Sequence, residues 1–267
     1  MAAGVATGEG AFRLDRFVLT LIGALAIQVA ANFANDASDA ARGADTADRV
    51  GPARMVAAGV ISAPAMWRAT FAATTVAAIC AVFLTVAVGP VILIIGVVSV
   101  LAMLGYVGGP APYGYRGLGE VAVFVFFGLV ATAGGRYAYD GTVSRAAWVL
   151  AIPVGLMAAA ILIVNNLRDI DTDRRVGKRT LAVIIGERAT RRLYAATVMF
   201  ALAVVAVAAV IGATPRATGV TVGWGVAAAL PLRQVLAGST TAALNAVLKA
   251  TARLHLAIGI TLAITTI

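Results

Sequence analysis

Charged residues are scarce in this chain. Of its 267 residues, 61% are hydrophobic and only 12% are charged, whereas a soluble domain is about half apolar and about a quarter charged. Apolar runs recur along the whole sequence, and each is long enough to cross a hydrocarbon core of about 30 Å as a helix. They lack the alternation of apolar and polar residues that marks the strands of a membrane barrel. The composition therefore predicts an all-α, polytopic transmembrane helical bundle.

Cysteine and histidine are rarer still. The single cysteine, Cys80, lies in an apolar run and has no second thiol with which to form an internal disulfide. The single histidine, His255, falls in the last apolar run, where we expect it to pack between helices and not to bind a metal. The first residues have no basic start, and the apolar run after them is too long for a signal peptide. These absences exclude a disulfide scaffold and a His/Cys metal centre.

Acidic residues are outnumbered, with 12 Asp and Glu against 21 Lys and Arg and a net charge of +9. In a soluble protein this excess would suggest a nucleic-acid partner. In a membrane bundle it is typical of basic loops that face the anionic cytoplasmic leaflet. We therefore expect a lipid bilayer, and no nucleic acid, as the partner of this surface.

The apolar runs predict eight transmembrane helices. Their expected ranges are 16–36, 69–88, 90–107, 118–136, 146–168, 191–211, 217–236 and 247–267. The segment 55–67 is too short to span and is expected at the interface. Eight helices place the loops 37–68, 108–117, 169–190 and 237–246 on one side, where most Lys and Arg residues gather. The positive-inside rule makes that side cytoplasmic in a multi-pass protein of the cell membrane.

The first of two acidic motifs reads NFANDASDAARGADTADRVGP, from Asn32 to Pro52. Asp36 and Asp39 are three residues apart and so share a helical face. Asp45 follows Gly43, a residue that lets the chain turn.

The second motif reads NNLRDIDTDRRVGKRT, from Asn165 to Thr180. Asp169 and Asp173 are four residues apart and share a face, while Asp171 points elsewhere. Both motifs begin with asparagine at the end of an apolar helix, where a polar side chain is costly and usually functional. These asparagines are Asn35, Asn165 and Asn166.

Carboxylates at this spacing can hold Mg²⁺ and leave positions open for phosphate oxygens. Two such faces that meet across a cavity would bracket a diphosphate, whose remaining charge basic residues would neutralise. The basic candidates are Arg174, Arg175, Lys178 and Arg179. The alternative is that these charged residues only belong to solvent-exposed loops, but the repeated pattern on one side of the membrane favours a metal-diphosphate site. A transporter or cation channel would instead place its carboxylates at mid-membrane depth.

A tyrosine-bearing loop, GYVGGPAPYGYRGLGE, lies on the same predicted side and contains Tyr106, Tyr113 and Tyr115. Aromatic ring faces can stabilise a cation such as the allylic cation left when a diphosphate departs. The alternative is an ordinary belt of interfacial aromatic residues. A lipid-embedded site of this composition suits a substrate with a long hydrocarbon tail and a diphosphate head.

The motifs NDASDAARGAD, PYGYRGLGEVAVFVFFG and NNLRDIDTDRRVGKRTLAV resemble those of the 1,4-dihydroxy-2-naphthoate polyprenyltransferases. That family belongs to the UbiA superfamily of intramembrane prenyltransferases, and the resemblance runs from about residue 17 to the C-terminus. It implies a Mg²⁺-dependent transferase of menaquinone biosynthesis. Such an enzyme transfers a polyprenyl group from its diphosphate to 1,4-dihydroxy-2-naphthoate, with loss of CO₂, to give demethylmenaquinone.

The resemblance also implies roles for residues of this chain. Asp36, Asp39, Asp45, Asp169 and Asp173 are expected to hold the metal and the diphosphate. The acceptor and cation region is expected to include Tyr113, Tyr115 and Arg116. Further substrate contacts are expected from Asn35, Asn165, Asn166, Arg42, Arg174, Lys178 and Arg179.

The chain departs from the family pattern at three points. The family has nine helices, and its first has no counterpart here, so we expect a single prenyltransferase domain over 1–267 without that helix. Ala111 stands where the family often has Lys, and Ile184 where it often has Arg. The alternatives are a superfamily member acting on p-hydroxybenzoate, haem or a chlorophyll precursor, and an inactive truncated homologue; the RGLGE loop favours naphthoate.

Overall fold

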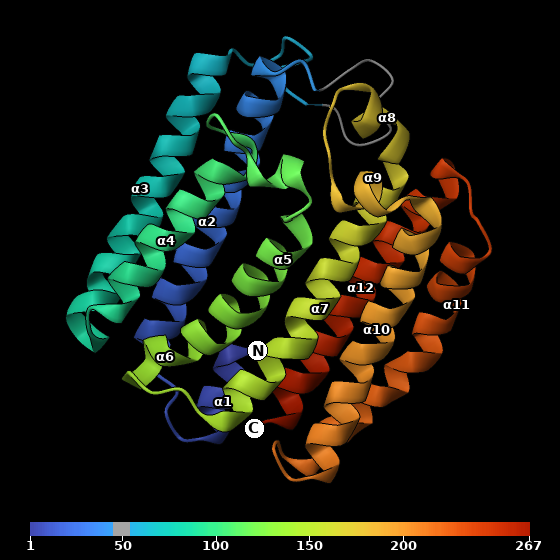
Figure 1. Ribbon diagram of the computed structural model, residues 1–267. Coiled ribbons are helices and arrows are strands. Elements are labelled where there is room, and N and C mark those ends of the chain that lie inside the picture. The colour runs from blue at the N-terminus through green and yellow to red at the C-terminus, as the bar shows by residue number, and fades with distance from the viewer. Residues whose placement is uncertain (45–53) are drawn as a thin grey trace. The chain divides into compact units, whose positions relative to one another are not determined.

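The computed structural model describes residues 1–44 and 54–267, and in these ranges the chain is helical, with no strand (Figure 1). The chain divides into two compact units. Unit 1 comprises Met1–Arg13, Glu120–Arg168 and Ile185–Ile267, and unit 2 comprises Leu14–Gly119 and Asp169–Ile184. The all-α prediction is confirmed.

Unit 2 holds three long helices followed by short ones. They are α2 (Leu14–Ala41), α3 (Ala63–Val88), α4 (Val91–Val107), the 3₁₀ turn η1 (Tyr113–Arg116), α8 (Ile170–Arg175) and most of α9 (Leu181–Ile185). α2, α3 and α4 pack side by side (Figure 1). Much of their apolar surface stays exposed, as at Phe71, Val86 and Leu101. Such a surface is expected of helices whose outer side contacts lipid.

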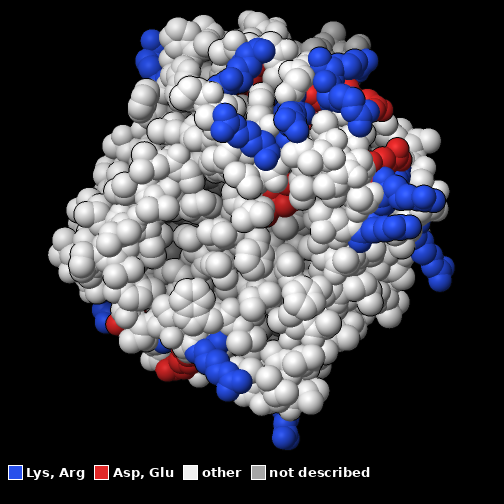
Figure 2. Space-filling model, in the orientation of Figure 1, with Lys and Arg blue, Asp and Glu red and all other residues white. Residues whose placement is uncertain are grey.

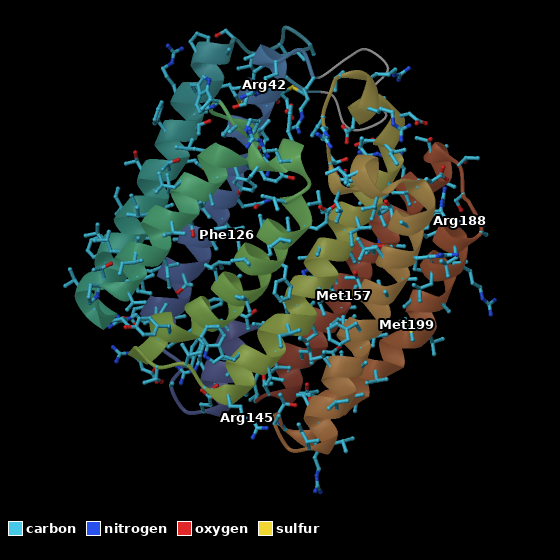
Figure 3. All side chains as sticks on the ribbon, viewed as in Figure 1. Arg42, Phe126, Arg145, Met157, Arg188 and Met199 are labelled. Carbon is cyan, nitrogen blue, oxygen red and sulfur yellow. The ribbon has the colours of Figure 1, made fainter. Side chains whose placement is uncertain are left out.

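Unit 1 is built on α7 (Arg145–Arg168), against which α10 (Glu187–Val210) and α12 (Thr241–Thr265) pack. Its other elements are α1 (Ala2–Gly8), α5 (Gly119–Val123), η2 (Phe124–Gly134), α6 (Gly135–Asp140), η3 (Arg216–Trp224) and α11 (Gly225–Leu236). Figure 3 labels two methionines that show the contrast between core and surface. Met157 of α7 is fully buried, whereas Met199 of α10 is more than half exposed.

Two glycines let η2 and α7 approach closely within unit 1. A Cβ added at Gly155 would lie 2.9 Å from the Cα of Gly128 and 2.8 Å from the carbonyl oxygen of Phe124. Contacts of this kind through small residues are typical of helix packing in membranes, where no hydrophobic force drives helices together.

Within residues 1–44 and 54–267, six helical spans are long and apolar enough to cross a membrane. They are Leu14–Ala41, Ala63–Val88, Gly119–Asp140, Arg145–Arg168, Glu187–Val210 and Thr241–Thr265. The shorter α4, with 17 residues, and the η3–α11 segment occupy the other two predicted ranges. The prediction of a multi-pass helical membrane protein is therefore confirmed.

The local geometry differs from the prediction at several places. The range 217–236 begins as 3₁₀ helix in η3, because β-branched residues and Gly219 and Gly223 are poor α-formers. The range 118–136 contains the π-helical η2, an uncommon form that is frequent at functional sites. The short helices α1, α8 and α9 were not predicted.

Candidate functional site

Asp36 and Asp39 both lie on α2, because this helix continues beyond its predicted end to Ala41. Both acids are buried. The two carboxylate oxygens of Asp36 accept hydrogen bonds from the backbone N–H groups of Met55 and Val56, at 3.0 and 3.1 Å. Asp36 therefore fixes the chain where it returns toward α3, in addition to any part in binding.

Asp39 lies one helical turn further along α2. The hydroxyl of Tyr115 donates to its Oδ1 at 2.6 Å, and Arg54 lies 3.7 Å from its Oδ2. Short hydrogen bonds to a carboxylate are among the stronger ones in proteins. Asp39 is thus oriented by a residue of η1 and balanced by a cation that the sequence did not single out.

The second acidic motif begins in the last turn of α7, and after Arg168 the chain turns into the short helix α8. Asp169 caps α8, and its carbonyl oxygen accepts from the N–H of Asp173 at 2.8 Å. The buried Asp173 also accepts a long hydrogen bond, 3.4 Å, from the hydroxyl of Thr180. Asp171 is exposed and pairs with Arg174 at 3.2 Å, so it does point away from Asp173.

The charged side chains of the two acidic motifs act on one another within unit 2. The pKa of Asp173 is raised from 3.8 to about 6, mainly because the carboxyl group is buried; Lys178 lowers it, and the carboxylates of Asp169 and Asp39 add to the rise. Carboxylates of both motifs therefore lie close enough to act on one another, with Lys178 as the cation that opposes them.

Two cations lie over the ring of Tyr115. The Nζ of Lys178 is 5.0 Å from the ring centroid, and the guanidinium carbon of Arg42 is 5.7 Å from it. Arg42, labelled in Figure 3, also donates to the carbonyls of Val107 and Gly109, which ties the end of α2 to the loop after α4. The Tyr115 ring thus positions protein cations, a use that differs from the expected stabilisation of an allylic cation.

Tyr113 holds the same loop to α4. Its hydroxyl donates to the carbonyl of Ala102 at 2.7 Å, and its ring meets Tyr106 edge-on with centroids 5.4 Å apart. Burial raises the pKa of the Tyr113 phenol. Gly117, with φ of +74°, completes the turn, and the Cδ1 atom of Ile184 fills the space where a Cβ would stand. The loop is therefore anchored on both sides.

The other predicted contacts of unit 2 lie at its surface or beside the acids. Arg116, Arg174 and Arg179 are exposed, and Asn35 is half-buried next to Asp36. Figure 2 shows basic and acidic side chains together over α8. Asp45 lies outside the described residues.

Asn165 and Asn166 belong to unit 1, where both have protein partners. The side chain of Arg168 donates to Asn165 at 2.9 Å and to Asn245 at 3.1 Å. Asn166 donates to the Oε1 atom of Glu120 at 2.9 Å, in a buried pair. Their roles in substrate binding stay predictions.

Sequence reasoning missed Arg54, Thr180 and Glu120. Arg54 and Thr180 contact Asp39 and Asp173 across loops, and no local spacing signals such contacts. Glu120 could have been identified from the sequence, because an acid that begins an apolar helix is unusual and marks a functional candidate.

The donor set fits Mg²⁺. Among the residues that the structure describes, no three His, Cys, Asp or Glu side chains converge as a complete metal centre. Mg²⁺ does not need one, since it is commonly bound by one or two carboxylates together with substrate phosphates and water. Asp39, Asp169 and Asp173 offer oxygen ligands of this kind.

Comparison with curated proteins finds several relatives named 1,4-dihydroxy-2-naphthoate octaprenyltransferase. The chain is 38% identical to a 1,4-dihydroxy-2-naphthoate octaprenyltransferase of Mycobacterium leprae (strain TN), over 67% of this chain and 60% of that protein. It is 37% identical to the protein of the same name from Escherichia coli (strain K12), over 69% of this chain and 62% of that protein. The chain thus spans about 60% of the length of these relatives.

Solved structures share the fold. A UbiA homologue from Aeropyrum pernix K1 superposes with a TM-score of 0.75 at 16% identity, covering 97% of this chain and 94% of that one. A digeranylgeranylglyceryl phosphate synthase gives a TM-score of 0.65 at 15% identity, covering 99% and 92%. The model of the UbiA prenyltransferase family matches residues 1–257. With these helices and paired acidic motifs, the chain belongs to the UbiA prenyltransferase family.

Proposed function

We propose that this chain acts as a single prenyltransferase domain of the cell membrane, with its site loops on the cytoplasmic side. It transfers a polyprenyl group from polyprenyl diphosphate to 1,4-dihydroxy-2-naphthoate, with release of diphosphate and CO₂. The observation that carries the proposal is that Tyr115 contacts both acidic motifs, through its hydroxyl to Asp39 at 2.6 Å and through its ring to Lys178 at 5.0 Å. The names of the relatives support the naphthoate acceptor.

The diphosphate head is bound by charges of both signs. Asp39, Asp169 and Asp173, with Asp36 behind them, would hold Mg²⁺, and the ion when bound would act as Lewis acid and charge clamp on the departing diphosphate. Lys178 supplies a fixed positive charge at a half-buried position. Because the Tyr115 ring lies beneath this ammonium, little reorganisation is needed when the diphosphate arrives.

Tyr115 links the halves of the site. Its hydroxyl orients Asp39 of the first motif, and its ring lies under Lys178 of the second. This arrangement keeps an acid and a base of different segments at fixed positions, as catalysis by electrostatic preorganisation requires.

The test is prenyl transfer by purified chain in lipid nanodiscs. Wild type is supplied with 1,4-dihydroxy-2-naphthoate, polyprenyl diphosphate and Mg²⁺, with and without EDTA. Asp39→Asn and Asp173→Asn remove one carboxylate charge each, while Asp15→Asn is the matched control, because Asp15 is exposed and pairs with its neighbour Arg16.

We expect metal-dependent product from wild type and from Asp15→Asn, and a loss of about 10²-fold or more in Asp39→Asn and Asp173→Asn. Equal activity in all four proteins would reject the assigned site. Absence of product from wild type, with product from another aromatic acceptor, would reject naphthoate as the substrate.

A further inference from the structure

Glu120 is a buried acid in unit 1 that no role assigned so far uses. It is 7% exposed and lies at the start of a membrane-spanning segment. Its Oε1 accepts from Asn166 at 2.9 Å. Its Oε2 is buried and has no hydrogen-bond partner among the described residues.

An unpaired carboxylate oxygen in an apolar span is costly, and in a native protein it usually has a use. A structural role, such as fixing the start of α5, would be met by Oε1 alone. The π-helical segment η2 begins four residues later, at Phe124, and π-helical turns are frequent at functional sites. The orphan oxygen and the irregular helix are independent observations that point to a ligand.

The bond from Asn166 determines what kind of ligand fits. Donation to Oε1 fixes the plane of the carboxyl group and leaves Oε2 as the oxygen without a partner. Acting as a base, this oxygen accepts a hydrogen bond, so it selects a ligand with a hydroxyl or N–H group.

We propose that Glu120 Oε2 binds a phenolic hydroxyl of the aromatic acceptor and takes its proton during prenyl transfer. The proposal rests on the proposed function, in which the acceptor carries a hydroxyl next to the carboxyl-bearing ring carbon.

The step balances without any further reactant. The allylic C–O bond of the donor breaks and a C–C bond forms at the carboxyl-bearing carbon, while the hydroxyl proton passes to Oε2 and its oxygen becomes a keto group. The C–CO₂⁻ bond then breaks, its electron pair restores the aromatic ring, and Glu120 returns the proton to the oxygen as CO₂ leaves. The carboxylate is regenerated at each turnover.

The kinetic test uses Glu120→Gln, which keeps an oxygen for Asn166 but cannot take a proton. Glu120→Asp keeps the charge at a shorter reach. The matched control is Glu187→Gln, since the Glu187 side chain is 59% exposed and pairs with Arg191. Turnover, both KM values and the pH profile of turnover are measured for each protein in nanodiscs.

We expect Glu120→Gln to lose about 10²–10⁴-fold in turnover, the range of general-base catalysis, with an unchanged KM for polyprenyl diphosphate. The fall of turnover at low pH should disappear in Glu120→Gln and persist in Glu120→Asp and in the control. Wild-type turnover with a wild-type pH profile in Glu120→Gln would overturn the proposal. If Glu120→Gln does not fold, unchanged turnover in Glu120→Asp would overturn it.

A binding test separates this proposal from the proposed function. The affinities of 1-hydroxy-2-naphthoate and 2-naphthoate, which differ only in the hydroxyl, are measured for wild type and both Glu→Gln variants. We expect a preference of about tenfold or more for the hydroxylated ligand, lost only in Glu120→Gln. If wild type makes no prenylated naphthoate yet shows this preference, the function fails and the hydroxyl site stands. The same preference in Glu120→Gln, or none in wild type, would overturn the site.

Discussion

The hydroxyl of Tyr115 donates to Asp39 Oδ1 at 2.6 Å across 76 residues of sequence. The same ring lies under Lys178. One side chain thus organises an acid of the first motif and a base of the second, and its two contacts can be separated by mutation.

Tyr115→Phe removes the hydroxyl and keeps the ring. We expect weaker binding of polyprenyl diphosphate with Mg²⁺, by about tenfold, because a hydrogen bond to a carboxylate contributes about 1.5–3 kcal/mol. Tyr115→Phe should keep the contact between the ring and Lys178. Tyr115→Leu loses the ring as well, so we expect it to bind polyprenyl diphosphate more weakly than Tyr115→Phe. Titration calorimetry measures the affinity, and Tyr137→Phe is the control because no contact of its hydroxyl is part of the site. Equal binding by Tyr115→Phe and Tyr115→Leu would show that the ring contributes nothing.

Asp173 makes stability depend on pH in EDTA. Its folded pKa of about 6 lies above the ordinary value of 3.8, so the folded state holds a proton that the unfolded state has lost between these pH values. Its contribution is therefore most favourable below pH 4 and falls as pH rises to about 6, by ~3 kcal/mol in all.

Asp173→Asn should abolish that pH dependence and be more stable than wild type at pH 7 in EDTA, although it lacks activity. Thermal unfolding between pH 4 and 7 measures both effects. If the stability of Asp173→Asn depended on pH as that of wild type does, the pH dependence would not come from Asp173.

Gly155→Ala tests the close approach of η2 and α7. The added Cβ meets Gly128 Cα and the Phe124 carbonyl at under 3 Å, and overpacking of this kind costs about 1–3 kcal/mol. Gly259→Ala is the matched control, because nothing lies within 4 Å of its Cβ and alanine favours the helix. Thermal unfolding in detergent should show a lower Tm for the first variant only.

Arg136 forms a buried ion-pair network in unit 1, with Glu9 at 2.6 Å and Asp140 at 2.8 Å. Arg136→Gln leaves both carboxylates without their cation; because the Glu9 and Asp140 side chains are 30% and 39% exposed, water stabilises them in part and the cost is about 1–3 kcal/mol. We expect a fall in Tm. The double variant Glu9→Gln/Asp140→Asn on that background should recover part of it, and no recovery would show that the network acts through packing alone.

The helices could be predicted well because their signal is local. The apolar runs placed all eight ranges, but some ends differ: α2 ends at Ala41 and not at 36, and α3 and α12 begin at Ala63 and Thr241 and not at 69 and 247. An apolar run stops where the membrane stops, but alanine-rich residues carried α2 on to Ala41. Helical form inside a run, as in η2 and η3, depends on packing and was not predictable from hydropathy.

The acidic residues could be predicted, but not their partners. Three- and four-residue spacing gave the shared faces and the outward position of Asp171. Which donor meets Asp39, or which amide meets Glu120, depends on contacts between segments far apart in sequence. The role of Tyr115 at the site stays a prediction; that its ring faces protein cations is revealed only by the folded loop.

The hydrogen bonds from Met55 and Val56 to Asp36 bear on how any mutational scan of this chain is interpreted. Asp36→Ala removes a candidate ligand. It also removes the acceptor of the hydrogen bonds from Met55 and Val56, which hold the backbone where it returns toward α3. Its phenotype therefore sums a chemical defect and a folding defect, whereas Asp39→Asn leaves those two backbone donors satisfied. Asp36 is therefore a folding residue as well as a candidate ligand, and loss of activity at this position does not by itself identify a ligand.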